Sequence, residues 1–275
     1  MTKRSRNGTA VVTGAGSGIG AAFAVELAHR GNRVVCADID DDAAACTVKT
    51  IHRNGGTATA IHCDVSRLDH VNSLAAQAQS WFGGPPTLVI NNAGVGAGGR
   101  LIGETPIDDW VWTLSVNLWG PIHGCHVFTP ILRAAARPAG IINVASAASF
   151  GAAPGMAAYN VSKAATLSLS ETLSAELSGT GIHVTVLCPT FVKTNIVHSG
   201  RITAESTVLA EKLMRWIGMS PDKVARMCLN TNDRGGLYCM PQYEARIAWG
   251  IKRFAPQTFT RTTGLVTRIG GAVTP

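Results

Sequence analysis

A tyrosine and a lysine four residues apart, Tyr159 and Lys163, have the types and spacing needed for acid/base chemistry. The segment around them has helical periodicity, and residues four apart lie on one face of a helix. A phenol with a pKa of about 10 is a poor base at neutral pH, but a nearby ammonium favours the phenolate and lowers that pKa. Tyr159 could then take a proton from an alcohol or return it to a ketone. Taken alone, the pair also fits an ordinary amphipathic helix with an exposed lysine.

A glycine-rich segment near the N-terminus, Thr13–Gly20, lies between an apolar β-type run and a helical one. Glycines permit a tight turn and a close approach of the backbone to a pyrophosphate. The N-terminus of the next helix presents free N–H groups and the positive end of its dipole to the phosphates. The segment is therefore interpreted as a dinucleotide-binding turn. Its expected contact residues are Gly14, Ser17, Gly18, Ile19 and Gly20.

The second apolar run ends at Asp38, 20 residues after Gly18. A carboxylate there can accept hydrogen bonds from the hydroxyls of the adenosine ribose. It would also repel a 2′-phosphate, so NAD is the expected cofactor rather than NADP. The alternative is a plain turn aspartate, because Asp40, Asp41 and Asp42 follow directly.

In combination, these features resemble the short-chain dehydrogenase/reductase family. The resemblance extends over about residues 8–195, with the motifs in the family's order and spacing. The matching positions are the Thr13–Gly20 turn, the Asn91–Gly94 segment, Asn117, Ser146 and the Tyr159–Lys163 segment.

The resemblance implies a role for each matching residue. Ser146 would hydrogen-bond the substrate oxygen and stabilise the charge that develops on it. Lys163 would also hold the nicotinamide ribose, and Asn117 would position a water that links Lys163 to solvent. The remaining implied cofactor contacts are Asp64, Val65, Asn91, Ala93, Gly94, Pro189, Val192 and Thr194, in addition to Tyr159 and Lys163.

Two departures from the family pattern lie after residue 188. Thr190 stands where the family usually has glycine, which places the local backbone geometry in doubt. The tail is expected to lack the family's usual closing strand, and residues 220–241 are more similar to longer hydroxysteroid- or retinol-type members.

Apolar β-rich runs must position these side chains. They recur at Thr9–Thr13, Arg33–Ala37, Thr57–Cys63, Leu88–Asn91, Gly140–Val144 and His183–Cys188. Helical segments alternate with them, among them Ile19–Arg30, Leu68–Phe82, Pro106–Ala136 and Ala157–Leu177. Continuous apolar strands alternating with helices are typical of a parallel sheet buried on both faces. The prediction is an α/β fold, a doubly wound Rossmann-type sheet in one domain over residues 1–275, with a substrate lid at about 190–220 and a C-terminal extension at about 221–275.

Composition and charge indicate the cellular compartment and the kinds of partner to expect. The seven cysteines form no CxxC pair, and no run is long and apolar enough for a signal peptide or a membrane span, which favours the cytoplasm. The net charge of +7 comes from dispersed basic residues, a basic start (Lys3, Arg4, Arg6), expected to be a solvated tail, and a basic end (Arg246, Lys252, Arg253, Arg261, Arg268). No aromatic residues interleave with the basic start, so nucleic-acid binding is not expected. His123 and His126 have ligand spacing but no companion ligand, so a core or interface pair is expected and no metal site.

Three functions remain open. The favoured one is NAD-dependent hydride transfer with a small-molecule secondary alcohol or ketone, hydrophobic because the 190–219 region is apolar. The alternatives are an NADPH-dependent carbonyl reductase and a non-catalytic dinucleotide-binding sensor on the same fold. By resemblance, a homodimer or homotetramer is expected, with Trp110, Trp112 and Trp119 buried in the core or in a subunit interface.

Overall fold

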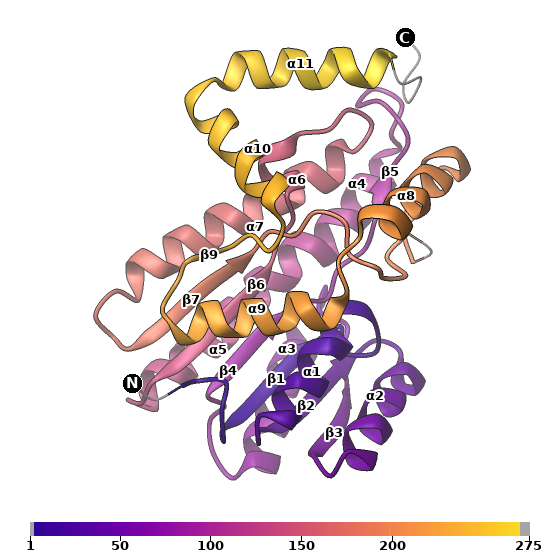
Figure 1. Cartoon of the computed structure of the whole chain (residues 1–275). Helices are drawn as coiled ribbons and strands as arrows, with labels where there is room; N and C mark the ends of the chain where they lie inside the picture. Colours follow the sequence, from indigo (N-terminus) through magenta and orange to yellow (C-terminus); the bar gives the residue numbers. More distant parts are fainter. Residues whose placement is uncertain (1–2, 198, 270–275) are drawn as a thin grey trace.

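A parallel sheet forms the centre of the chain, in a computed structural model that describes residues 3–197 and 199–269 (Figure 1). Its seven strands lie in the order β3-β2-β1-β4-β6-β7-β9, which confirms the doubly wound fold predicted from the sequence. The strands are β1 (Thr9–Thr13), β2 (Arg33–Asp38), β3 (Thr57–His62), β4 (Leu88–Asn91), β6 (Ala139–Val144), β7 (Ile182–Leu187) and β9 (Tyr238–Cys239). Two further short strands, β5 (Ala97–Gly98) and β8 (Arg201–Ile202), pair with each other in parallel.

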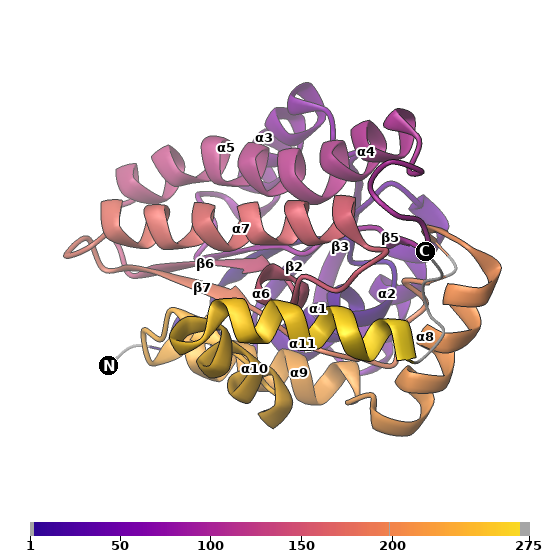
Figure 2. The same cartoon turned by 90° about the horizontal axis from the view of Figure 1, so that it is seen from above.

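Helices cover both faces of the sheet, as the view from above shows (Figure 2). They are α1 (Gly18–His29), α2 (Asp41–Arg53), α3 (Leu68–Phe82), α4 (Ile107–Leu114), α5 (Gly120–Ala134), α6 (Ala148–Gly151), α7 (Ala157–Glu176), α8 (Ala204–Ile217), α9 (Pro221–Asp233), α10 (Tyr243–Phe254) and α11 (Pro256–Ile269). On one face, Phe23 and Leu27 of α1 pack with α9 against the strands. On the other, Leu74 of α3 and Phe128 of α5 pack with α7. The central strands β1, β4 and β6 are largely apolar because both of their faces are buried, whereas the edge strand β3 alternates between buried and exposed residues.

The start of α2 and the end of the tail show what the sequence patterns did not. Asp40, in the acidic stretch after β2, is the N-cap of α2 and accepts a hydrogen bond from the Ala43 N–H at 3.0 Å. The tail does have a closing strand, contrary to expectation: β9 pairs with β7, Tyr238 opposite Val186 and Cys239 opposite Leu187. Two residues are too few to show a strand pattern, so only the paired partner reveals this strand.

The basic start of the chain is solvated only in part: Lys3 and Arg6 are exposed, whereas Arg4 is docked on the sheet. The guanidinium of Arg4 donates to the carbonyl oxygens of Ala139 at 2.9 Å and Gly181 at 3.1 Å, and it contacts His183 Nε2 at 3.0 Å. His183 Nδ1 lies 3.1 Å from the Asn232 carbonyl, so it donates there while Nε2 accepts from Arg4. Burial lowers the pKa of Arg4. The prediction of a free tail was wrong for Arg4 because a charge run cannot show which carbonyls are left unpaired where β6 and β7 begin.

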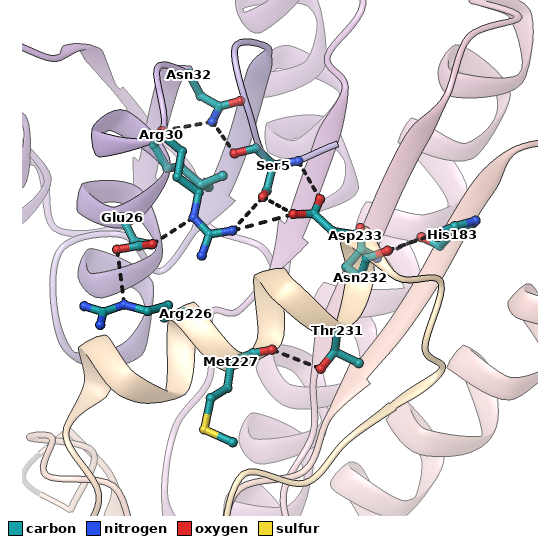
Figure 3. A network of polar contacts seen from close by, with 11 residues as sticks. Ser5, Glu26, Arg30, Asn32, His183, Arg226, Met227, Thr231, Asn232 and Asp233 are labelled. Carbon is teal, nitrogen blue, oxygen red and sulfur yellow. Dashed lines mark hydrogen bonds and ion pairs between the residues drawn. The ribbon is translucent and has the colours of Figure 1, made fainter. Parts of the chain in front are cut away.

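A buried polar network ties the start of the chain to α1 and α9 (Figure 3). Asp233 accepts hydrogen bonds from the Ser5 N–H at 2.9 Å and the Ser5 hydroxyl at 2.7 Å. Arg30 lies 3.6 Å from the same carboxylate and pairs with Glu26 at 2.8 Å. Asn32 donates to the Ser5 carbonyl at 2.7 Å. The network lies at the amino ends of the strands, so it stabilises the fold at the edge opposite to the motifs singled out from the sequence.

None of the helices in the described part of the chain has the length and apolar character needed to span a lipid bilayer.

Asp233→Ala should lower the free energy of unfolding by about 3 kcal/mol, because it leaves the Arg30 guanidinium buried with one carboxylate fewer. Urea denaturation measures the loss. Asp69→Ala is the matched control, since Asp69 pairs with Arg67 on the surface and exposed ion pairs contribute little. Equal effects of the two substitutions would contradict a stabilising role for the buried network.

Candidate active site

The residues with acid/base chemistry lie at the carboxyl ends of the central strands. Tyr159 and Lys163 lie one turn apart on α7, and the Lys163 Nζ is 5.7 Å from the centre of the Tyr159 ring. The lysine side chain is buried, and its ammonium donates to the Val144 carbonyl at the end of β6 at 3.0 Å. Burial lowers the pKa of Lys163 to about 8. The spacing-based prediction of one shared helix face is therefore met, and the lysine is not an exposed surface residue.

Ser146 follows β6 and lies beside Tyr159. Its hydroxyl accepts from the Ala148 N–H at 3.1 Å, which fixes its position. Burial raises the pKa of Tyr159, and the hydrogen bond with Ser146 lowers it by less. The tyrosine is half-buried as a whole, but its hydroxyl end is surrounded by protein. The pKa of Tyr159 in the protein alone is therefore raised, not lowered as expected from the neighbouring Lys163, because removal of water from the phenolate is the dominant effect.

Asn117 lies in a π-helical turn, Ser115–Trp119, between α4 and α5. The sequence predicted one continuous helix from Pro106 to Ala136, and this turn interrupts it. The Asn117 side chain accepts from the Val95 N–H at 2.8 Å and donates to the Val95 carbonyl at 2.9 Å. Its main-chain carbonyl accepts from Thr166 at 3.1 Å and keeps a second lone pair. A water between Asn117 and Lys163 would therefore bind at this carbonyl, not at the side chain.

The glycine-rich turn has the backbone that the sequence suggested. Gly14 and Gly18 adopt positive φ angles of 63° and 55°, which disfavour any other residue. A Cβ on Gly14 would lie 2.7 Å from the Ala93 Cα. Asn92, which the sequence analysis did not single out, donates to the carbonyls of Thr13 at 2.9 Å and Gly14 at 3.1 Å and so fixes the turn against β4.

The N-terminus of α1 is open toward a ligand. Ser17 is its N-cap in an extended conformation, and its side chain makes no capping hydrogen bond. The first N–H groups of a helix lack internal partners, so the hydroxyl and these N–H groups can bind phosphate. Ile19 and Gly20 lie in this first turn, and a Cβ on Gly20 would overlap the Gly14 carbonyl.

Asp38 lies at the carboxyl end of β2, beside the turn. Its Oδ2 accepts from the Gly16 N–H at 2.7 Å, and its Oδ1 accepts from the Asp40 N–H at 3.0 Å. Each carboxylate oxygen keeps a further lone pair for a ribose hydroxyl. The structure therefore places the carboxylate next to the glycine turn.

The other expected cofactor contacts differ in which of their groups are available to bind a ligand. Asp64 accepts from the Ser66 N–H at 3.0 Å and from its hydroxyl at 2.7 Å, and Val65 is buried against Gly120. The Asn91 side chain is buried and donates to Asn143 Oδ1 at 2.8 Å, so only its backbone remains for a ligand. Ala93 lies against the turn, and Gly94 lies against Asn117 and Lys163: a Cβ on Gly94 would lie 3.1 Å from Asn117 Oδ1 and 3.4 Å from Lys163 Nζ.

The segment after β7 is held by the C-terminal part of the chain. The Thr190 hydroxyl donates to Glu244 at 2.8 Å, and the Thr190 N–H donates to Gln242 at 3.2 Å. Gln242 is buried and also donates to the Phe191 carbonyl at 3.0 Å. The threonine in the family's glycine position is therefore fixed by two side chains of the tail. Sequence reasoning missed Gln242 and Glu244 because more than 50 residues separate them from Thr190 and neither belongs to a motif.

The rest of this segment reaches the glycine turn. A Cβ on Gly18 would lie 3.1 Å from the Thr194 methyl, so Thr194 covers the N-terminus of α1. Val192 is buried and forms a β-bridge with Met219. The helix between them, α8, has no buried side chain.

The two histidines expected to lie in the core or in a subunit interface differ in burial, and His126 does not lie in the core of the single chain. His123 Nδ1 lies 2.9 Å from the Val65 carbonyl, whereas His126 is exposed. Trp119, expected to be buried in the core or an interface, is 52% exposed in the single chain.

Comparison with known proteins identifies similar chains. The model of the short chain dehydrogenase family matches residues 8–204. Probable oxidoreductase EphD of Mycobacterium tuberculosis is 34% identical over 92% of this chain, which spans only 44% of that relative's length. A 1-deoxy-11-beta-hydroxypentalenate dehydrogenase of Streptomyces avermitilis is 37% identical over 74% of this chain and 77% of its own. A Burkholderia phymatum short chain dehydrogenase/reductase, solved in complex with NAD, superposes with a TM-score of 0.88 at 32% identity, over 94% of this chain and 96% of that one.

Burial of Lys163 predicts a pH-dependent stability difference. Its pKa is about 8 in the folded protein against a usual value of 10.5. Between these values the unfolded chain binds the proton more strongly, so stability rises with pH. Relative to Lys163→Met, the wild-type protein should gain roughly 2–3 kcal/mol in free energy of unfolding from pH 8 to pH 10. Urea denaturation across that range measures the gain, and a constant difference would show that the pKa of Lys163 is not lowered in the folded protein.

Proposed function

The chain belongs to the short-chain dehydrogenase family, and on that basis we propose that it is an NAD-dependent oxidoreductase that converts a hydrophobic secondary alcohol to a ketone. The observation that carries the proposal is the convergence of Ser146, Tyr159 and Lys163 beside Asn117 at the carboxyl ends of the strands. Ligands of doubly wound sheets bind at this edge.

The chain's own residues fit the cofactor. The open N-terminus of α1 with Ser17 would hold the pyrophosphate, with Thr194 covering it. Asp38 would accept from both hydroxyls of the adenosine ribose, and its negative charge disfavours a 2′-phosphate. Lys163, with two N–H donors left after its bond to Val144, would hold the nicotinamide ribose. Bound NAD would supply the hydride acceptor.

Side chains of the protein would carry out the proton transfer. Tyr159 would take the alcohol proton at its phenolic oxygen, while Ser146 hydrogen-bonds the same substrate oxygen. Because burial raises the pKa of Tyr159, the ionised form needs added positive charge nearby. Lys163 gives part of that charge, and the positive charge of the oxidised cofactor gives the rest. The proton would leave through Lys163 and a water on the Asn117 carbonyl.

The substrate class rests on the lid and on one relative. The segment from 190 to 220 exposes apolar side chains, among them Val208, Leu209 and Trp216. Closure of such a segment would surround a substrate with apolar surface and exclude water. The Streptomyces relative is named for a hydroxy compound, 1-deoxy-11-beta-hydroxypentalenate.

Tyr159→Phe should reduce the turnover of NAD with a hydrophobic secondary alcohol by at least about 100-fold, the usual contribution of a general base. The rate of NADH formation over a panel of such alcohols measures it. Tyr243→Phe, at an exposed position on α10, is the matched control and should keep full turnover. A loss below tenfold for Tyr159→Phe would exclude the proposed acid/base mechanism.

Asp38→Asn should raise the Kd for NAD about tenfold and narrow the preference for NAD over NADP, because it removes the charge that binds the diol and repels a 2′-phosphate. Isothermal titration with each cofactor measures both effects. Asp41→Asn is the control, since Asp41 is exposed and paired with His62 in the same acidic stretch. A wild-type preference for NADP would instead favour the carbonyl reductase. Binding of NAD without turnover of any alcohol would favour the dinucleotide sensor.

A further inference from the structure

A cavity of about 650 Å³ opens at the surface between α9, β9 and α10. Its volume is in the range usual for small-molecule sites. The wall on α9 is one face of that helix, formed by Met227, Asn230, Thr231 and Arg234. Figure 3 shows Met227 and Thr231 on the side of α9 opposite to Arg30. Among the described residues, none of those assigned to the candidate active site lines this cavity, so the two places are separate.

Two arginines give the cavity a positive charge. The Arg246 Nε donates to the Met240 carbonyl at 2.9 Å, which leaves the four N–H groups on its terminal nitrogens without an acceptor among the described residues. The Arg234 guanidinium makes no hydrogen bond or ion pair within the described part of the chain. Both charges act on one thiol of the wall: a hydrogen bond with Cys228 lowers the pKa of Cys239, and Arg246 and Arg234 lower it further. Two guanidinium groups with free N–H donors near one point are suited to bind a carboxylate or a phosphate.

No carboxylate lines the cavity among the described residues. The carboxylates on the neighbouring elements are bonded elsewhere. Glu171 accepts from the Tyr238 hydroxyl at 2.6 Å, and Glu244 accepts from the Thr190 hydroxyl at 2.8 Å. Asp233 is buried in the network of Figure 3. The two arginines therefore lack an acidic partner in the wall, and an anionic ligand would supply it.

The rest of the wall is aromatic and apolar. The half-buried Trp249 ring lies 5.6 Å from the Tyr238 ring, and the Arg253 guanidinium lies 5.2 Å from the Trp249 ring. These contacts hold the indole in place. The thioethers of Met227 and Met240 line the cavity as well, and thioethers adapt to ligands of different shape. The cavity therefore combines a cationic rim with a surface for a flat apolar group.

We propose that this cavity binds a small amphipathic anion. Its carboxylate or phosphate would lie between Arg234 and Arg246, and its apolar body would lie against Trp249. Because the two arginines come from α9 and α10, one oxyanion can bridge the two helices. Contact with the aromatic wall adds to the binding, since exposed charges alone interact weakly in water. The site therefore discriminates against a neutral ligand of the same shape.

Isothermal titration of the whole chain with 2-naphthoate tests the role of charge. Arg234→Gln should raise the Kd about tenfold, because a charged hydrogen bond is lost. Arg226→Gln is the matched control: it removes the same charge from α9, but Arg226 faces Glu26 at 3.8 Å, away from the cavity. The neutral 2-naphthamide, which has the same shape, should bind at least about tenfold more weakly than 2-naphthoate. Equal binding of the two molecules, or an unchanged Kd in Arg234→Gln, would overturn the proposal.

Methyl NMR spectra of the protein labelled with carbon-13 at its methionine methyl groups locate the bound probe. The aromatic rings of 2-naphthoate should shift the resonances of Met227 and Met240, which line the cavity. Met156, three residues before Tyr159 at the start of α7, should not shift. Replacement of each methionine by leucine assigns its resonance. Shifts at Met156 without shifts at Met227 and Met240 would place the probe at the candidate active site and overturn the proposal.

Discussion

The burial of the Lys163 ammonium is the constraint on which the site depends. Burial of a charge is costly unless the charge is hydrogen-bonded, and among the described residues Lys163 has one acceptor for its three donors, the Val144 carbonyl. The lowered pKa reflects this incomplete compensation. Any ligand that brings oxygen acceptors to the ammonium would therefore stabilise it. The hydroxyls of a ribose are such acceptors, and an ionised Tyr159 would act in the same direction. Tyr159 is under the same pressure, since burial raises its pKa. Hydroxyl oxygens of a ligand would stabilise the buried ammonium, and added positive charge would stabilise the ionised form of Tyr159.

Holding the lysine there requires a fixed position of α7 on the sheet. Ser149 donates to the Lys163 carbonyl at 2.8 Å, and Thr166, one turn farther on, donates to the Asn117 carbonyl at 3.1 Å. The π-helical turn at Asn117 is thus bonded to the same helix that carries Tyr159 and Lys163. Its side chain in turn holds the loop after β4 through Val95. A few side-chain to backbone bonds therefore set the relative positions of β6, α7 and the loop after β4. The buried network at Asp233, at the other end of the strands, stabilises the fold without touching this site.

Patterns within short stretches of sequence predicted those elements whose structure depends on the short stretch alone. Continuous apolar runs identified six of the seven strands of the main sheet, because burial on both faces leaves a simple pattern. The turn at Gly14 and Gly18 and the spacing of Tyr159 and Lys163 were equally readable. The sequence could not show β9, whose two residues are defined by pairing with β7. Nor could it show the π-helical turn, since helical periodicity continues through Asn117, or the docking of Arg4 on distant carbonyls. The pKa of Tyr159 was misjudged because a helix spacing reveals a neighbouring charge but not the loss of water.

The departure at Thr190 shows how the tail and the site are connected. A glycine at this position would keep the main-chain bond to Gln242 but lose the hydroxyl bond to Glu244. With threonine, the hydroxyl and N–H are bonded to Glu244 and Gln242, so the segment that leads to Val192 and Thr194 is fixed from the C-terminal side. Glu244 lies in the first turn of α10, and Gln242 is its N-cap. Any force that shifts α10 is therefore transmitted through these two side chains to the segment that covers the glycine turn. The C-terminal extension is thus a structural part of the site, since the loop it holds has no other side-chain tether at Thr190 among the described residues.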